Sequence, residues 1–443
     1  MDTSHRLLNA RLKELLGKIY PNEDTEDLAQ TVLEIFWPDE STPRKRARSP
    51  SNRLWSERDA LLITYGDTLI DGQHKPLDLL LDFLTRHMKG VVSGVHILPF
   101  FPFSSDDGFA VTDYRAVNQR LGEWSDIARI AQRFHLMSDL VLNHVSSQSN
   151  WFNEYRQGNA PYDEFFYEGN PEDDLSEVVR PRTTPLLQKI ETRDGEKHVW
   201  CTFSHDQIDL NFENPEVLLE MLRIIRVHID KGVRILRLDA VAFLWKVPGT
   251  TSIHLPETRA IVQLLRLLAD YTSEPVVLLT ETNVPRTENL SYFGNRNEAH
   301  AVYNFPLPPL ILHAMQSGTA RYLHAWQSSM PPAQLGCAYL NFTASHDGCS
   351  LFDVMRRTFK GVDEHHIARF LCSQTIPMSL EGIPAIYAHS LLATPSDHEA
   401  VERRGMNRAI NRHRWQYPDL LERLADPSTD QHKVMHALSE RFK

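Results

Sequence analysis

The sequence of 443 residues contains no apolar run of about 18 residues, so we expect no helix that spans a membrane. The N-terminus begins Met1-Asp2-Thr3 and lacks the apolar segment of a secretory signal peptide. Acidic residues outnumber basic ones by 58 to 47, and the net charge of −11 argues against a general nucleic-acid-binding surface. These absences predict a cytoplasmic protein that binds neither membranes nor nucleic acid.

Cysteine is also scarce. The four cysteines form no CxxC pair, and their spacing suits neither a zinc site nor a disulfide framework. No glycine-rich phosphate loop of either standard type is present. We therefore expect free thiols in a reducing compartment, no metal and no cofactor. The cysteines are Cys201, Cys337, Cys349 and Cys372.

Hydrophobic residues make up 42% of the chain and charged residues 24%, which is typical of a globular protein. Leucines such as Leu8, Leu12 and Leu15 recur at helical spacing near the start and predict helices over residues 1–40. The basic run at 44–48 is interpreted as a solvated linker. Residues 1–55 are therefore expected to form an N-terminal helical extension and its linker.

From Leu61 onward, short apolar runs alternate with amphipathic helical stretches. This alternation is typical of βαβ units with a parallel sheet, and eight such strands predict an α/β fold of the (β/α)₈, or TIM-barrel, type. The expected strands are 61–64, 95–98, 136–142, 233–238, 276–280, 301–303, 338–343 and 384–387.

One stretch breaks the alternation. Residues 145–215 are rich in Asn, Pro, Asp and aromatic residues, and the stretch is too long for a plain loop. We expect an inserted subdomain here, after the third strand, with the barrel formed by residues 56–144 and 216–443. Nothing in the sequence indicates the oligomeric state.

Polar clusters follow several predicted strands. The third strand ends in Asn143-His144, the fourth in Arg237-Leu238-Asp239 and the fifth in Thr280-Glu281, while His346-Asp347 follows the seventh. Catalytic groups of such barrels lie at the carboxyl ends of the strands, so these side chains are expected to share one pocket.

Two carboxylates in one pocket suit cleavage of a glycosidic bond with retention, which needs a nucleophile and a proton donor about 5–5.5 Å apart. We assign Asp239 as the nucleophile, kept ionised by Arg237, and Glu281 as the general acid/base, whose pKa must be raised. Asp347, His144 and His346 would bind sugar hydroxyls.

The same residues carry a resemblance. Asp139-Leu-Val-Leu-Asn-His144, Arg237-Leu-Asp-Ala240, Glu281 and His346-Asp347 resemble the four signature regions of the α-amylase family of glycoside hydrolases. The resemblance covers residues 60–415 or so, and it implies a (β/α)₈ barrel with the roles given above.

A narrower resemblance is to the sucrose-phosphorylase branch, whose members transfer glucose to inorganic phosphate and release α-glucose 1-phosphate. It implies that Asp106, Phe109, Gln207 and Arg412 contact the glucosyl group. It also implies a phosphate-binding role for Arg182, with Arg180 beside it. The similar motifs are 61–65, 94–100, 106–109, 121–124, 180–182, 207–209 and 411–413.

Two positions depart from the sucrose phosphorylases. Phe243 and Asn283 stand where those enzymes carry Tyr and His near the phosphate. This pattern is similar to that of the glucosylglycerate phosphorylases and implies glycerate as the acceptor. Glycerol, fructose and fructose 6-phosphate stay open as alternatives.

Two segments of the family are not in this sequence. In the family, several dozen residues containing a mobile acceptor-site loop follow the His-Asp-Gly motif, whereas here Gly348 runs directly into Cys349. The family's C-terminal β-domain is also not present. Either the complete protein contains these segments, which we favour, or it lacks them.

Two other functions are open. A hydrolase or transglucosidase would use the same Asp239, Glu281 and Asp347, and only Arg182 argues for phosphate. A barrel that binds without catalysis is less favoured, because all three carboxylates are present.

Overall fold

The computed structural model describes residues 3–38 and 54–443. The chain divides into two compact units, each of which is described by itself. The first unit comprises the described part of Met1–Leu54, together with Pro99–Asn118 and Ser138–His300. The second unit comprises Trp55–Leu98, Gln119–Met137 and Ala301–Lys443.

Eight parallel strands form a closed barrel in the order β1-β15-β12-β11-β10-β9-β4-β3. This confirms the predicted barrel, and each strand lies within about two residues of its expected position. Nearly all strand residues are buried, which explains why the strands are continuous apolar runs. The strands are β1 (Leu61–Thr64), β3 (Gly94–Ile97), β4 (His135–Val141), β9 (Val233–Asp239), β10 (Val277–Thr280), β11 (Ala301–Tyr303), β12 (Ala338–Asn341) and β15 (Ile383–Tyr387).

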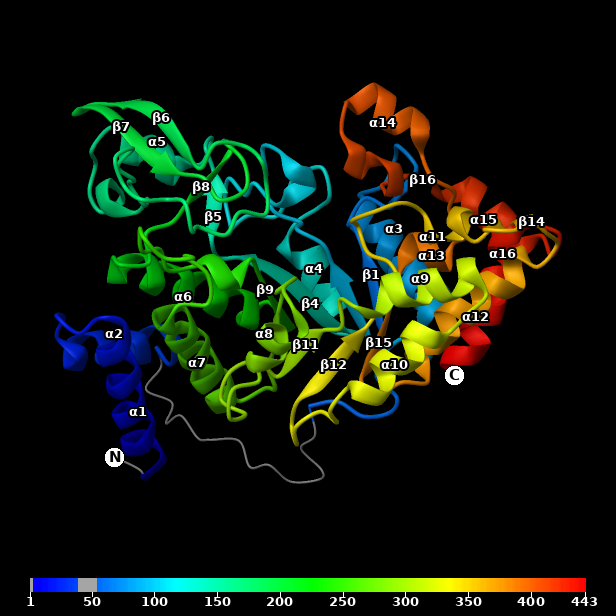
Figure 1. Cartoon of the computed structure of the whole chain (residues 1–443), viewed down its shortest axis with the longest axis horizontal. Coiled ribbons are helices and arrows are strands. Elements are labelled where there is room, and N and C mark those ends of the chain that lie inside the picture. The colour runs from blue at the N-terminus through cyan, green and yellow to red at the C-terminus, as the bar shows by residue number, and fades with distance from the viewer. Residues whose placement is uncertain (1–2, 39–53) are drawn as a thin grey trace. The chain divides into compact units, whose positions relative to one another are not determined.

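The N-terminal segment forms two helices of the first unit, α1 (Thr3–Ile19) and α2 (Thr25–Phe36). Leu8 and Leu12 of α1 are fully buried, and α1 packs against α7 (Pro256–Tyr271) while α2 packs against α6 (Pro215–Asp230) (Figure 1). The extension therefore covers two of the helices that follow barrel strands. The basic run at 44–48 lies outside the described residues.

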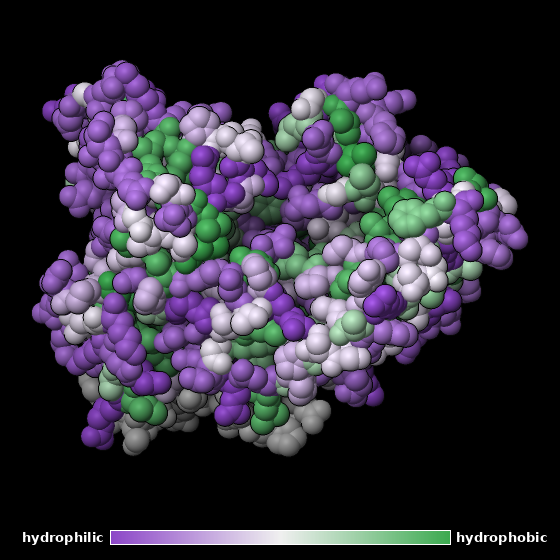
Figure 2. All heavy atoms as spheres, in the orientation of Figure 1, coloured by the Kyte–Doolittle hydropathy of each residue, from purple (hydrophilic) through white to green (hydrophobic). Residues whose placement is uncertain are grey.

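Residues 144–209 contain short elements of the first unit. β5 (His144–Ser146) pairs with β8 (Gln207–Asp209) antiparallel, so that His144 lies opposite Asp209 and Ser146 opposite Gln207. A hairpin of β6 (Leu187–Thr192) and β7 (Gly195–Trp200) follows helix α5 (Asn150–Arg156) in the chain, and hydrophilic residues predominate over its surface (Figure 2). Trp200 of β7 forms a small hydrophobic core with Val178 and Leu186.

The remaining elements connect the strands or follow the barrel. In the first unit these are η3 (Asp106–Gly108), η4 (Tyr162–Glu164), η5 (Val241–Phe243) and α8 (Arg286–Ser291). In the second unit they are β2 (Leu69–Ile70), α3 (Pro76–Phe83), η2 (Leu84–Met88), α4 (Trp124–Ala131), α9 (Leu307–Ser317), α10 (Arg321–Ser329), α11 (Leu351–Val354), β13 (Arg357–Thr358), β14 (Gly361–Val362), α12 (His366–Met378), α13 (Ala388–Leu391), α14 (His398–Arg404), η6 (Asn407–Asn411), β16 (Trp415–Gln416), α15 (Tyr417–Ala425) and α16 (Asp430–Phe442).

Across residues 3–38 and 54–443, none of the helices combines the length and apolar character that a membrane crossing needs. All four cysteines are free; Cys201 and Cys337 are buried, and Cys349 and Cys372 are exposed.

Candidate active site

The guanidinium group of Arg237 contacts three carboxylates of the first unit. Arg237 and Asp239 are two residues apart on β9, so their side chains point to the same side of the strand. Arg237 donates hydrogen bonds to Asp139 on β4 and, at 2.6 Å, to Oδ1 of Asp239. Its Nη2 lies 3.9 Å from Oε1 of Glu281. One buried cation therefore contacts carboxylates on or directly after three neighbouring strands, β4, β9 and β10.

The surroundings of Asp239 shift its pKa in opposite directions. Burial raises the pKa of Asp239, Arg237 lowers it, and the nearby Asp139 raises it, with a net increase. The expectation that Arg237 keeps Asp239 ionised was therefore incomplete, because it left out the burial of the carboxylate and the second acid that shares the guanidinium. The Asp239 carboxylate is therefore more basic than that of an exposed aspartate.

Glu281 follows β10 directly, and the register pairs Thr280 with Leu238. The backbone N–H of Glu281 donates to the carbonyl oxygen of Leu238 at 3.1 Å. Its Oε2 accepts a hydrogen bond of 3.3 Å from the N–H of Ala240, whose backbone is left-handed with φ of 51°. The turn after β9 thus holds the Glu281 carboxylate beside the strand that carries Asp239.

Four of the predicted substrate-binding residues meet in the same unit. Nε2 of His144 lies 3.1 Å from the carbonyl oxygen of Phe109 and 3.1 Å from Nε2 of Gln207. Gln207 also donates to Oδ2 of Asp106 at 3.2 Å. The Phe109 ring lies 5.6 Å from the guanidinium carbon of Arg237. Since Arg237 bonds Asp239, these four residues lie close to the Asp239 carboxylate.

The backbone near Asp106 is unusual. Asp106 and Asp107 both have left-handed conformations, with φ of 54° and 50°. Such conformations are uncommon for residues other than glycine and often accompany functional sites. His144 is buried, and burial lowers its pKa, which favours the neutral imidazole. Its ring contacts protein atoms here, so its predicted contact with a sugar hydroxyl stays a prediction.

Direct contacts do not join the residues that were predicted to bind phosphate or acceptor. Arg180, Arg182 and Asn283 are exposed, and Arg182 makes one hydrogen bond of 3.4 Å, to the carbonyl oxygen of Pro181. Phe243 packs edge-on against Phe203 at 5.6 Å. Phe203 in turn lies 5.1 Å from the ring of His144. Phe243 is therefore linked to the substrate-binding group.

Lys246 was not predicted from the sequence. It is almost fully buried, and its Nζ lies 3.1 Å from Oδ2 of Asp209. It also donates to Oδ1 of Asn143 at 3.0 Å and to the carbonyl oxygen of Phe243 at 2.9 Å. Burial lowers the pKa of Lys246, while Asp209 raises it. The only signal in the sequence is a single lysine within the apolar run 240–247.

The remaining predicted residues belong to the second unit. Oδ1 of Asp347 pairs with Nη2 of Arg408 at 2.9 Å, and Nε2 of His346 lies 3.5 Å from Oδ2 of Asp347. The Asp347 side chain is 62% exposed, in the stretch where Gly348 leads directly to Cys349 and α11. The sequence had not indicated Arg408 as a partner of Asp347.

Arg412 is anchored in the same unit. It pairs with Asp67 at 2.6 Å and lies 3.4 Å from the ring centroid of Tyr65. Burial raises the pKa of Asp67, but Arg412 and Arg414 lower it to a net decrease. The ring of Tyr65 also meets His346 edge-on at 6.2 Å. Tyr65 and Asp67 thus position two of the predicted substrate-binding side chains.

The described residues offer no group of three or more His, Cys, Asp or Glu side chains that could hold a metal ion. The expectation that the reaction needs no metal or cofactor stays a prediction.

Comparison with known proteins defines the class. A family model described as the catalytic domain of alpha amylase matches residues 81–409. The chain belongs to the α-amylase family.

Comparison with individual proteins identifies relatives whose names are more specific than the family. The chain is 43% identical to a glucosylglycerate phosphorylase of Allomeiothermus silvanus over 477 aligned residues, which cover 95% of this chain and 86% of the relative. It is 40% identical to the glucosylglycerate phosphorylase of Escherichia coli, over 98% of this chain and 85% of the relative. The 477 aligned positions exceed the 443 residues of this chain, so the first relative has positions with no counterpart here.

The fold is also found in solved structures. Sucrose 6F-phosphate phosphorylase from Thermoanaerobacter thermosaccharolyticum superposes with a TM-score of 0.75 at 23% identity. The superposition covers 89% of this chain and 88% of that structure, which supports the barrel fold.

We predict that Lys246→Met lowers the free energy of unfolding by about 3–5 kcal/mol, because it leaves the buried carboxylate of Asp209 without its cation. Urea unfolding measures the change. Lys189→Met is the matched control; Lys189 and Glu196 form an exposed pair, so its loss should cost about 0–1 kcal/mol. Equal effects of the two substitutions would show that the buried pair is not a structural requirement.

Proposed function

We propose that this protein is a retaining α-glucoside phosphorylase, which transfers a glucosyl group to inorganic phosphate and forms α-D-glucose 1-phosphate. The observation that carries the proposal is the contact of one buried arginine, Arg237, with both Asp239 and Glu281. Retaining cleavage needs two carboxyl groups of different protonation state at one bond. The 43% and 40% identity to glucosylglycerate phosphorylases supports the choice of reaction.

In the first step, Asp239 attacks the anomeric carbon of the bound glucoside, and the bond to the leaving oxygen breaks. Glu281 donates a proton to that oxygen, so the oxygen leaves as a hydroxyl group of the acceptor. The product is a β-glucosyl ester of Asp239. The N–H of Ala240, 3.3 Å from Oε2 of Glu281, holds the acid in place as its proton leaves.

In the second step, a phosphate oxygen attacks the anomeric carbon, and the bond from that carbon to Asp239 breaks, which releases the carboxylate; the second inversion gives overall retention. If the attacking phosphate carries one proton, Glu281 accepts that proton. Asp106, Phe109, His144 and Gln207 would surround the glucosyl group. We assign the same substrate-binding role to the Asp347, His346 and Arg412 side chains of the second unit.

We further propose that Arg182 and Arg180 bind the phosphate. Both side chains are exposed, and neither pairs with an acid among the described residues, which leaves their guanidinium groups available for bidentate contact with a phosphate. The segment 145–215 that carries them would act as an inserted subdomain, with Phe243 and Asn283 next to the acceptor.

The proposed acceptor is glycerate, so the substrate would be 2-O-α-glucosylglycerate. The identities to glucosylglycerate phosphorylases and the Phe243 and Asn283 positions support this choice. We also propose that the enzyme works in a reducing compartment such as the cytoplasm, since all four of its cysteines are unpaired.

The acceptor is tested by incubating the full chain with α-glucose 1-phosphate and glycerate, glycerol, fructose or fructose 6-phosphate, and measuring released phosphate. We expect release that requires glycerate. Asp239→Asn, which keeps the size of the side chain but removes the nucleophile, should abolish it. Release of the same size without any acceptor would contradict the proposal and indicate a hydrolase.

Arg182→Ala separates a phosphorylase from a hydrolase or transglucosidase that uses the same carboxylates. We expect kcat/KM for phosphate to fall about 10- to 100-fold, as for the loss of a charge-assisted hydrogen bond, with hydrolysis of the glucoside unchanged. Lys189→Ala, which removes another exposed cation of the same segment, is the control and should change neither rate. Equal loss of both activities in Arg182→Ala would rule out the phosphate role.

The pKa of Asp239 sets an expected pH dependence. Asp239 must be ionised to attack, and its pKa is raised, so kcat/KM should fall with decreasing pH at a value above the ordinary aspartate pKa of about 3.9. Asp139 contributes to that increase, so Asp139→Asn should move the acid limb to lower pH. A limb that stays in place in Asp139→Asn, with an unchanged melting temperature, would contradict this assignment.

A further inference from the structure

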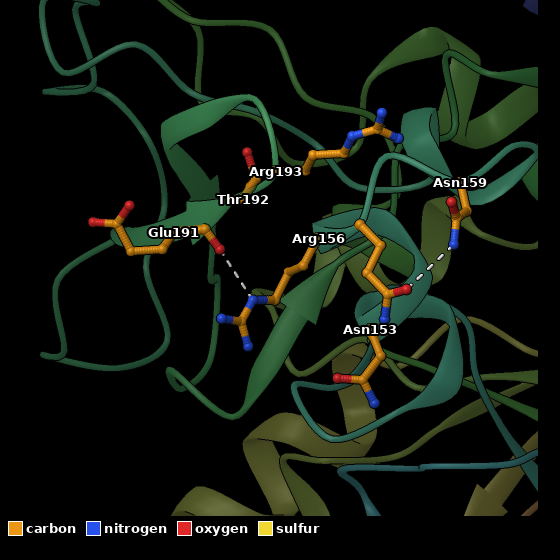
Figure 3. A pocket seen from close by; sticks show the side chains of 7 residues that line it. Asn153, Arg156, Asn159, Glu191, Thr192 and Arg193 are labelled. Atoms are coloured by element: carbon orange, nitrogen blue, oxygen red, sulfur yellow. Dashed lines mark hydrogen bonds between the residues drawn. The ribbon is translucent and has the colours of Figure 1, made fainter.

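A polar pocket of about 640 Å³ lies within the first unit, outside the residues assigned above. Helix α5, the turn that follows it and the turn between β6 and β7 form its walls (Figure 3). Its volume is within the range of small-molecule sites. The lining residues are Asn153, Arg156, Gln157, Asn159, Glu191, Thr192 and Arg193.

The pocket has two guanidinium groups that no acid neutralises. Among the described residues, neither Arg156 nor Arg193 has a carboxylate partner. Their neighbours on the hairpin are paired, since Lys189 bonds Glu196 and Lys197 bonds Glu168. The pocket lining holds these two arginines and one acidic residue, Glu191, so it carries a net positive charge, in a chain whose net charge is −11.

Hydrogen bonds hold the backbone of Arg193 and the side chain of Arg156. The N–H of Arg193 donates to the carbonyl oxygen of Arg156 at 2.8 Å, which joins the β6–β7 turn to the end of α5. Nε of Arg156 donates to the carbonyl oxygen of Glu191 at 3.1 Å, so its two terminal nitrogens stay available. The Glu191 carboxylate points away from the other labelled side chains (Figure 3).

The other walls supply amide and hydroxyl groups. Asn159 donates to Glu154 at 2.6 Å and to Gln157 at 3.4 Å, which orients its amide group. Figure 3 shows the two guanidinium groups apart, on different sides of the pocket. A ligand that uses both must therefore carry more than one polar group. Guanidinium groups suit phosphate or carboxylate, and side-chain amides suit hydroxyls.

We propose that this pocket binds a phosphomonoester of a small polyol, such as a sugar phosphate, with Arg156 and Arg193 as its anion-binding residues. Arg156 bonds the phosphate through its terminal nitrogens, Arg193 and the amide of Asn153 bond oxygens farther along the ligand, and the amide oxygen of Asn159 accepts from a ligand hydroxyl. The site is separate from Asp239 and its neighbours, and the proposal does not rest on the phosphorylase function.

Isothermal titration of the full chain with sorbitol 6-phosphate tests the proposal. This open-chain phosphomonoester has no anomeric carbon that a glucosyl-transfer site could act on. We expect one binding site, with affinity at least about tenfold weaker in Arg156→Gln/Arg193→Gln. Arg156→Lys/Arg193→Lys, which keeps the charge but not the fork of donors, should be intermediate. Arg441→Gln, an exposed arginine of α16, is the control and should bind as the unchanged chain does.

Neutral sorbitol and inorganic phosphate are the comparison ligands, and both should bind more weakly than sorbitol 6-phosphate. Equal binding of inorganic phosphate would overturn recognition of the polyol, and equal binding of sorbitol would overturn recognition of the anion. No binding to the unchanged chain, or unchanged binding in Arg156→Gln/Arg193→Gln, would overturn the site. Because both arginines are exposed, their loss should leave the melting temperature and the rate of glucosyl transfer unchanged.

Discussion

The buried guanidinium group of Arg237 is the interaction on which the rest of the candidate site depends. It bonds Asp139 and Asp239 and approaches Glu281 at 3.9 Å, so three acids share one cation. Without that cation, three carboxylates in so little space would take up protons, because like charges and burial both raise the pKa of an acid. Arg237 opposes these effects at Asp239, whose pKa it lowers, although burial and Asp139 leave that pKa with a net increase.

Buried ion pairs also hold the surrounding segments. Lys246 joins the end of β4, through Asn143, to β8, through Asp209, and Asp209 lies opposite His144 in the β5–β8 ladder. The position of His144 therefore depends on a buried lysine that contacts both Asp209 and Asn143. Pairs of this kind contribute little net stability but are costly to break, which favours one arrangement of the side chains over others.

The sequence predicted the barrel because its strands are buried on both faces and appear as apolar runs at regular intervals. It also predicted the pairing of Arg237 with Asp239, since residues two apart on a strand share a side. It did not predict the pairs Lys246–Asp209, Arg408–Asp347 and Arg412–Asp67, which join distant parts of the chain. Spacing along the sequence carries no information on such contacts. For the same reason the net pKa of Asp239 required the buried position of Asp139.

The proposed reaction depends on a covalent bond between Asp239 and the glucosyl group. The most direct measurement is mass spectrometry of the full chain after incubation with 5-fluoro-α-glucosyl fluoride, which forms a glycosyl-enzyme that turns over slowly. We expect one fluoroglucosyl group per chain, on the peptide that contains Asp239, and its loss when inorganic phosphate is added. A label on another carboxylate, or no label in an enzyme that turns over its substrate, would show that Asp239 is not the nucleophile.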